Sequence, residues 1–161
     1  MNLSLHVLNL DDLLDVCRRL PPEERALFAA FGDTFSPEDA AISAFNSIGM
    51  NWIIKDADGA PVAAGGMTLQ RKGVYRSWFY APEDSWSAHG PELTELVRSV
   101  VKNALVPDLA HRIETVTLAS RSRARAWYEK VGLTYESTLR GYGVDGQDAV
   151  MYVALRDAEN I

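Results

Sequence analysis

The spacing of apolar residues along the chain alternates between the period of a strand and that of a helix. Leu3, Leu5 and Val7 are separated by polar residues, which predicts an N-terminal strand with one buried face. From residue 10 to residue 17 apolar side chains recur every three or four positions, and Asp11 lies where the N-terminus of a helix favours acidic side chains. The chain is therefore expected to begin with a strand and then a helix, which ends before Pro21.

Two more helices and three antiparallel strands are expected before residue 82. Their ranges are 23–31 and 37–48 for the helices and 51–56, 62–70 and 74–81 for the strands. Ser36 and Pro37 have the pattern of an N-cap followed by a first-turn proline. The dipeptide Asp58-Gly59 suits the tight turn of a hairpin. The last of these strands, VYRSWFYA, is rich in the aromatic residues that strands favour.

The second half of the chain predicts a long helix, a strand, a short helix and two final strands. Their ranges are 91–105, 113–119, 122–131, 133–140 and 149–155. The long helix is expected to begin near Pro91, and Gly132 is typical of a helix C-cap. This order predicts an α/β fold over residues 1–161, as a single domain with a mixed, mostly antiparallel sheet and helices on both of its faces.

Composition and charge narrow the functional classes. The chain has 161 residues, 47% hydrophobic and 24% charged, which is the ordinary mix of soluble globular proteins. A net charge of -6 argues against nucleic acid or an anionic membrane as a partner. Cys17 is the only cysteine, so no intrachain disulfide is possible, and no metal-ligand spacing surrounds it. No secretion signal or long apolar stretch is present. These features predict a cytoplasmic protein without a metal site.

The segment AWYEKVGL, the strand after it and the final strand DAVMYVAL resemble the GNAT acyltransferase superfamily, whose members carry a Tyr-x-Lys-x-Gly-Phe-like segment there. The likeness covers nearly the whole chain in element order, and it is specific in sequence over about the last third. It implies a GNAT-like fold in which acetyl-coenzyme A (acetyl-CoA) lies between splayed central strands. A small-molecule or protein amine would attack the thioester directly.

The resemblance also implies roles for particular residues. Tyr128 matches the tyrosine that protonates the departing thiolate, and a phenol that is neutral at pH 7 suits this task. A packed core aromatic is the alternative for the same side chain. Backbone N–H groups at Phe79, Tyr80 and Ala81 would hold the thioester oxygen. The strand VYRSWFYA carries no carboxylate, so Glu83, just after it, is the candidate catalytic base, and ordinary solvated surface is its alternative.

The pyrophosphate loop of the family is poorly matched. The alignment places its key positions on Ser85, Ala88, Gly90 and Glu92, of which Gly90 alone matches. Such a loop works by pointing bare N–H groups at phosphate, and Glu92 places a negative charge there instead. His89 is a candidate donor that would offset part of this loss, and a solvent-exposed loop histidine is the alternative.

Basic residues near the short helix are further candidates for binding the coenzyme. Arg121, Arg123, Arg125 and Lys130 would contact its phosphates, whose charge arginine holds well, and an exposed helix face is the alternative for all four. For the amine, the acidic side chains of Asp33, Glu38 and Asp39 hint at a cationic acceptor.

A second likeness concerns the strings SWFYAPEDSW and WYEKVGLTYE. They look like small GNAT-like proteins of short-tailed bacteriophages, including internal virion proteins. Two hypotheses follow. The first is an N-acyltransferase that moves an acetyl group from acetyl-CoA to an amine. The second is a catalytically weak or inactive GNAT-fold phage protein, a virion or host-interaction factor with phage virion proteins as partners, located in the virion or the host cytoplasm. A homodimer is possible under either hypothesis.

Overall fold

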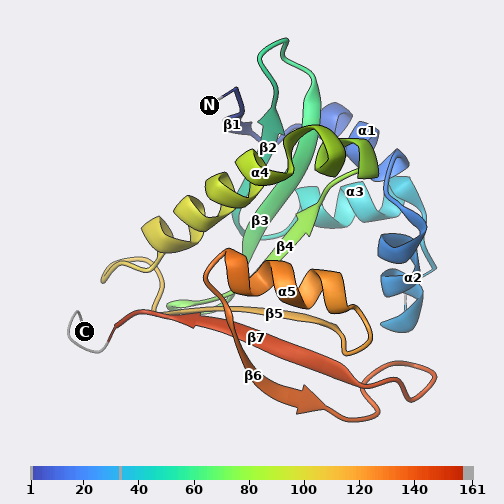
Figure 1. Cartoon of the computed structure of the whole chain (residues 1–161), viewed down its shortest axis with the longest axis vertical. Helices are drawn as coiled ribbons and strands as arrows, with labels where there is room; N and C mark the ends of the chain where they lie inside the picture. The colour runs from blue at the N-terminus through green and yellow to red at the C-terminus, as the bar shows by residue number, and fades with distance from the viewer. Residues whose placement is uncertain (1, 33, 158–161) are drawn as a thin grey trace.

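The sheet is mixed and mostly antiparallel, as predicted. The computed structural model describes residues 2–32 and 34–157. Within them, seven strands form one sheet in the order β1-β2-β3-β4-β5-β7-β6 (Figure 1). The strands are β1 (Ser4–Val7), β2 (Gly49–Lys55), β3 (Pro61–Arg71), β4 (Val74–Tyr80), β5 (Arg112–Leu118), β6 (Thr134–Leu139) and β7 (Ala149–Leu155). Of the neighbouring pairs in this described sheet, β4 and β5 run parallel and the others antiparallel.

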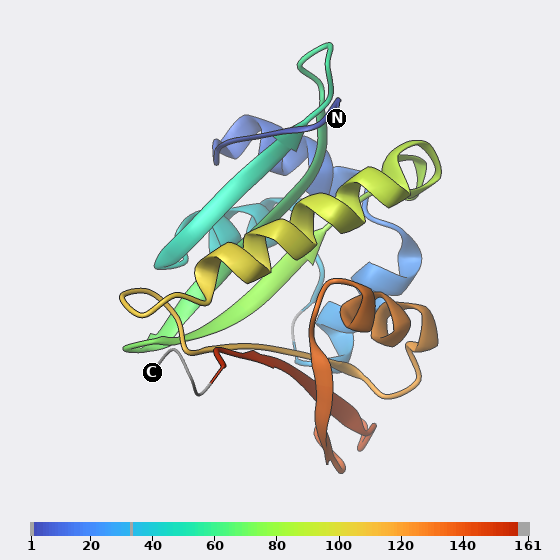
Figure 2. The same cartoon turned by 60° about the vertical axis from the view of Figure 1, so that its left-hand side comes forward.

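Helices cover both faces of the sheet, which confirms the predicted layers (Figures 1 and 2). They are α1 (Leu10–Arg18), α2 (Pro22–Ala30), α3 (Pro37–Phe45), α4 (Glu83–Ala104) and α5 (Ser122–Lys130). On one face, Leu13 of α1 and Ala41 of α3 pack with Ile53 of β2. On the other face, Val101 of α4 and Val131 at the end of α5 pack with Ile113 of β5. The sheet therefore separates two apolar layers.

The local signals for turns and caps are confirmed. Gly59 has a φ of 82° in the β2–β3 hairpin, and Gly132 has a φ of 99° just after α5. Both values lie in the left-handed region that glycine enters without steric cost. The Ser36 side chain accepts a hydrogen bond from the Asp39 N–H at 3.2 Å and so caps α3.

The first strand is less buried than its alternating pattern predicts. Leu3 is 6% exposed, but Leu5 and Val7 are 37% and 88% exposed. In the described sheet β1 is an edge strand that pairs with β2 alone. Of the three apolar side chains that the alternating pattern predicts to be buried, Leu3 alone is buried.

The start of α4 differs from the prediction. The helix begins at Glu83, directly after its N-cap Pro82, and Pro91 lies inside it. Trp86 packs against the same apolar cluster as the later α4 residues, so the inward face of the helix begins well before the proline. Pro91 is exposed, where the missing N–H costs a single main-chain hydrogen bond. Residues 85–92 are helical, and the predicted pyrophosphate loop over this segment is wrong.

The parallel pair at the centre of the sheet separates partway along its length. β4 and β5 are paired through three consecutive positions, the last of which joins Arg76 to Glu114. Both strands then continue, to Tyr80 and Leu118, without further pairing to each other. Figure 2 shows the two strands meeting near one end and diverging toward α5. The sheet is therefore forked at its middle.

Candidate functional site

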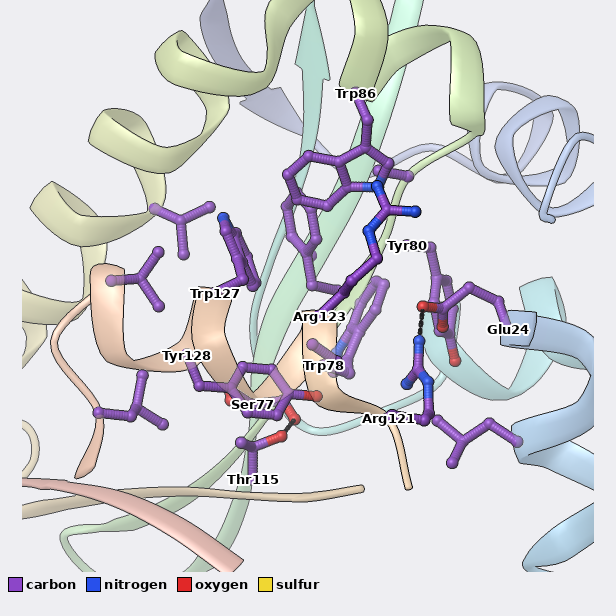
Figure 3. Close-up of a pocket in the computed structure, with 18 of the residues that line it drawn as sticks. Glu24, Ser77, Trp78, Tyr80, Trp86, Thr115, Arg121, Arg123, Trp127 and Tyr128 are labelled. Atoms are coloured by element: carbon purple, nitrogen blue, oxygen red, sulfur yellow. Dashed lines mark hydrogen bonds and ion pairs between the residues drawn. The ribbon is translucent and has the colours of Figure 1, made fainter. Parts of the chain in front are cut away.

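A cleft of about 1020 Å³ opens where β4 and β5 diverge. It reaches both faces of the sheet, because Phe79 packs with the cluster under α4 whereas Trp78 and Tyr80 pack with the cluster of α1 and α3, and all three line the cleft. Figure 3 shows the side chains that surround it, drawn from α2, β4, α4, β5 and α5. A passage of this kind admits two reactants from opposite sides.

A cluster of charged side chains holds β4 and β5 together at the closed end of the fork, where the two strands are still paired. Glu114 is buried and accepts hydrogen bonds from Arg76 and Arg112, each at 2.9 Å. Burial alone would raise the pKa of the Glu114 carboxyl, but these two arginines outweigh burial and hold that pKa below its ordinary value. Arg112 also pairs with Glu136 of β6. These ion pairs fix the point at which the strands part.

One main-chain N–H group of β4 is directed into the cleft. Thr115 Oγ1 lies 3.5 Å from the Ser77 carbonyl oxygen, to which it donates, so the Ser77 backbone faces β5. Backbone groups alternate in direction along a strand, and therefore the N–H of Phe79 faces the same side. At Phe79 the strands have already separated, and β5 no longer pairs with β4. This N–H is available to a carbonyl oxygen in the cleft.

Tyr128 reaches the cleft from α5. Its ring contacts Tyr152, with centroids 5.5 Å apart, and it lines the cleft close to Thr115 (Figure 3). Burial raises the pKa of the Tyr128 phenol, while Arg121 and Thr117 act to lower it. The pKa stays above its ordinary value, so the phenol is neutral at physiological pH and can donate a proton. The side chain is thus both packed and cleft-lining.

An ion pair on the wall of the cleft joins the start of α5 to α2. Arg121, at the N-cap of α5, donates to the carboxylate of Glu24 (Figure 3). It also donates to the hydroxyl of Thr117 at 3.0 Å. The Arg121 and Glu24 side chains are 14% and 21% exposed, so the pair is largely shielded from water. Arg125, in contrast, donates to Tyr152 and to the Ala119 carbonyl and does not line the cleft.

Aromatic rings form the wall between α4 and α5. The Trp127 ring centroid lies 5.0 Å from that of Phe79 and 5.1 Å from that of Trp86. Trp127 also donates from Nε1 to Thr94 Oγ1 of α4 at 3.1 Å. The three rings line the cleft, and the hydrogen bond ties the two helices together beside them.

The first turn of α4 is acidic and already hydrogen-bonded. The carboxylate of Asp84 accepts from the N–H of Ser85 at 3.0 Å, and the Pro82 carbonyl accepts from the same N–H at 3.1 Å. Asp84 also lies 3.4 Å from Arg19 of the α1 C-cap. Glu83 is exposed and lines the cleft. This helix start presents two carboxylates, and its Ser85 N–H is hydrogen-bonded within the chain.

The structure brings some of the predicted residues together and separates others. Those that line the cleft are Tyr128, Glu83, Phe79, Tyr80, Ala81 and Arg121. His89, Gly90 and Arg125 do not line it. His89 and Gly90 lie in the second turn of α4. Their assignment as loop residues is therefore wrong.

The residues expected to attract a cationic acceptor lie elsewhere. Glu38 does not line the cleft and pairs with Arg18 at 3.5 Å, and Asp39 does not line it either. Asp33 falls outside the described residues. The carboxylates that line the cleft from α2 belong to Glu23 and Glu24. In the sequence these two look like ordinary first-turn acids of a helix, so no local signal distinguished them.

The described part of the chain places no three His, Cys, Asp or Glu side chains where they could share a metal ion. Among the same residues, no helix has the length and apolar character needed to cross a membrane.

Solved structures with the same architecture include acetyltransferases. Spermidine N-acetyltransferase from Vibrio cholerae, in complex with CoA and spermine, superposes with a TM-score of 0.75 at 14% identity, over 96% of each chain. A GNAT-family acetyltransferase from Bacillus anthracis gives a TM-score of 0.75 at 13% identity, over 97% of this chain and 96% of that one. No protein-family profile and no curated protein sequence matches the chain. The protein has the GNAT fold, and the expected phage kinship stays a prediction.

Proposed function

We propose that the protein is an N-acyltransferase that moves the acetyl group of acetyl-CoA to an amine within the cleft between β4 and β5. One observation carries the proposal: the strands diverge to leave a passage through the sheet, with a neutral phenol at its side and with the edge of β4 beyond Arg76 no longer paired to β5. The fold supports it too, since a structural neighbour was solved with CoA and an amine bound.

The reaction needs one bond to form and one to break. The nitrogen lone pair attacks the thioester carbonyl carbon, and the N–H of Phe79 stabilises the negative charge that develops on the carbonyl oxygen. The C–S bond then breaks, and the thiolate takes a proton from Tyr128. The amine nitrogen loses a proton to water or to Glu83 through water, and Tyr128 regains one from solvent. The products are an amide and a thiol.

The residues that line the cleft fit the pantetheine arm of acetyl-CoA better than its nucleotide. The aromatic wall of Phe79, Trp86 and Trp127 suits the pantetheine arm that carries the thioester, because that arm is largely uncharged. The diphosphate finds no cradle at the start of α4, where Glu83 and Asp84 lie. The aromatic wall therefore supports thioester binding, and Arg123 and Lys130, which line the cleft from α5, are the side chains that would meet the phosphates.

The acceptor side favours a small cationic amine. Glu23 lines the cleft from α2, and Trp78 and Tyr80 form a wall with ring centroids 4.9 Å apart. Carboxylates and aromatic faces both attract alkylammonium groups. The neighbour from Vibrio cholerae was solved with spermine bound, which agrees with an acceptor of this class.

The test is transfer by the purified protein. Acetyl-CoA is incubated with a panel of diamines, polyamines and amino acids, and the amide is identified by mass spectrometry while free thiol is titrated. We expect one amide product and an equal amount of thiol. If no amine is acetylated and acetyl-CoA causes no shift in the melting temperature, the enzyme proposal is wrong and the non-catalytic hypothesis is favoured.

A further inference from the structure

Two threonines of β5 lie against the phenol of Tyr128. Thr115 and Thr117 are two positions apart on the strand, so their side chains share one face of the sheet with Ile113, and Tyr128 packs on that face. Both threonine hydroxyls interact with the Tyr128 phenol, and Figure 3 shows Thr115 beside it. Thr115 lines the cleft, whereas Thr117 does not line it and is fully buried. Thr117 can therefore influence a reactant only through Tyr128.

The outer partners of these two threonines fix the direction of their hydrogen bonds. Arg121 donates to Thr117 Oγ1 at 3.0 Å, and a guanidinium group cannot accept. Thr117 therefore accepts from Arg121 and keeps its own hydrogen for the phenol oxygen. Thr115 Oγ1 donates to the carbonyl oxygen of Ser77, 3.5 Å away, and a carbonyl cannot donate. The single hydrogen of the Thr115 hydroxyl is thus in use, and toward Tyr128 this hydroxyl can only accept.

These constraints give the whole chain of hydrogen bonds one direction. It starts at the Arg121 guanidinium, passes through Thr117 to the Tyr128 oxygen, and continues from the Tyr128 hydrogen to Thr115. Hydrogen bonds in such a chain polarise one another, and here the first donor is positively charged. The phenol hydrogen of Tyr128 is consequently directed toward Thr115, the threonine that lines the cleft.

From this direction we infer that Thr117 is a positioning residue for acyl transfer: it holds the Tyr128 proton toward the departing sulfur and donates to the phenolate once that proton has left. The inference rests on the proposed function, in which the Tyr128 O–H bond breaks as the S–H bond forms and water later returns a proton. A hydrogen bond to a charged acceptor is stronger than one to a neutral acceptor, so Thr117 favours the transfer over the resting state. In agreement, burial raises the pKa of the Tyr128 phenol, and Arg121 and Thr117 oppose that rise.

The test separates the hydroxyl of Thr117 from its bulk. Thr117→Val keeps the size and branching of the side chain and removes the hydroxyl, whereas Thr117→Ser keeps the hydroxyl. For each variant kcat and KM are measured with acetyl-CoA and the amine that the unaltered protein acetylates. We expect kcat of Thr117→Val to fall about 10-fold with both KM values within about 2-fold, and kcat of Thr117→Ser to stay within about 3-fold of the unaltered protein. An unchanged kcat in Thr117→Val, or an equal fall in Thr117→Ser, overturns the inference and leaves the proposed function standing. Absence of transfer by the unaltered protein overturns both.

A double-mutant cycle gives a second readout. In the Tyr128→Phe background no phenol remains to be held, so Thr117→Val should change kcat by less than about 2-fold there. A fall of about 10-fold in both backgrounds would show that Thr117 acts on the fold and not through the proton donor, and it would overturn the inference. Thr138→Val is the matched control, because it removes a threonine hydroxyl that is hydrogen-bonded to a tyrosine, Tyr135, at 2.8 Å, on β6 and outside the cleft lining. Its kcat should equal that of the unaltered protein.

Discussion

The two ends of the β4–β5 pair perform different tasks with the same two strands. At the closed end, Arg76 and Arg112 surround the buried Glu114, and the backbones are hydrogen-bonded. At the open end the backbones part, and Tyr128 and the N–H of Phe79 face a cleft. The comparison shows how a stable sheet acquires an internal site: a few charged contacts hold the strands up to one position, and the next positions are free to bind.

The largest expected effect concerns the open end. Tyr128→Phe removes the proton donor and keeps the ring that packs against Tyr152. We expect kcat to fall at least about 100-fold, as for other general acids, while the donor Kd stays unchanged. Steady-state kinetics and calorimetry measure the two quantities.

The control for this change is Tyr135→Phe, on the exposed β6 strand, where a phenol is lost without any contact with the cleft. Its kcat should match that of the unaltered protein. Equal activity in Tyr128→Phe would remove Tyr128 as the acid and leave it as a packed aromatic side chain.

The next effect concerns the ion pair between Arg121 and Glu24 on the wall of the cleft. Arg121→Ala leaves Glu24 without its partner in a position that is 21% exposed. We expect the free energy of unfolding to fall by about 2 kcal/mol, since a shielded charge loses its hydrogen-bonded counter-ion. Urea denaturation measures the change.

A double-mutant cycle with Glu24→Ala sharpens this result. If the pair acts as a unit, Arg121→Ala should cost less in the Glu24→Ala background than in the unaltered protein. Additive effects would show that Arg121 stabilises the fold through Thr117 and not through the contact with α2.

The smallest effect concerns the closed end and its pH dependence. Arg76 and Arg112 hold the pKa of the Glu114 carboxyl below its ordinary value of about 4.3. The ionised carboxylate therefore stabilises the fold fully above that pH. This stabilisation is lost as the pH falls through the lower pKa of the folded state. Glu114→Gln should lower the free energy of unfolding at pH 7 by about 1 kcal/mol. The variant's free energy of unfolding should also fall less steeply than that of the unaltered protein below about pH 4.3. An unchanged acid slope in unfolding titrations would contradict this assignment.

Much of the fold was predictable from local signals. Gly59 and Gly132 mark a turn and a helix end because few other residues enter their backbone conformation. The position of Tyr128 followed from the helix that Gly132 ends, and the structure places it on the cleft. Its catalytic role remains a prediction. These features depend on neighbours in the sequence, and a pattern can therefore reveal them.

Other features depend on distant parts of the chain. Glu24 and Arg121 are 97 positions apart and neither carries a local mark of the pairing. Gly90 and Pro91 have the local look of a helix boundary, but tertiary packing of Trp86 extends α4 past them. The position at which β4 and β5 part is set by the contacts of Glu114, which no periodicity encodes.

The placement of the tryptophans gives the molecule an optical property. The chain contains four tryptophans, and Trp52, Trp78, Trp86 and Trp127 all border the cleft. Every indole emitter in the protein therefore borders the same space, and a molecule that enters it changes the polarity around the indoles that it contacts. Intrinsic fluorescence is consequently a label-free gauge of occupancy, and four single Trp→Phe variants would map which wall each reactant touches.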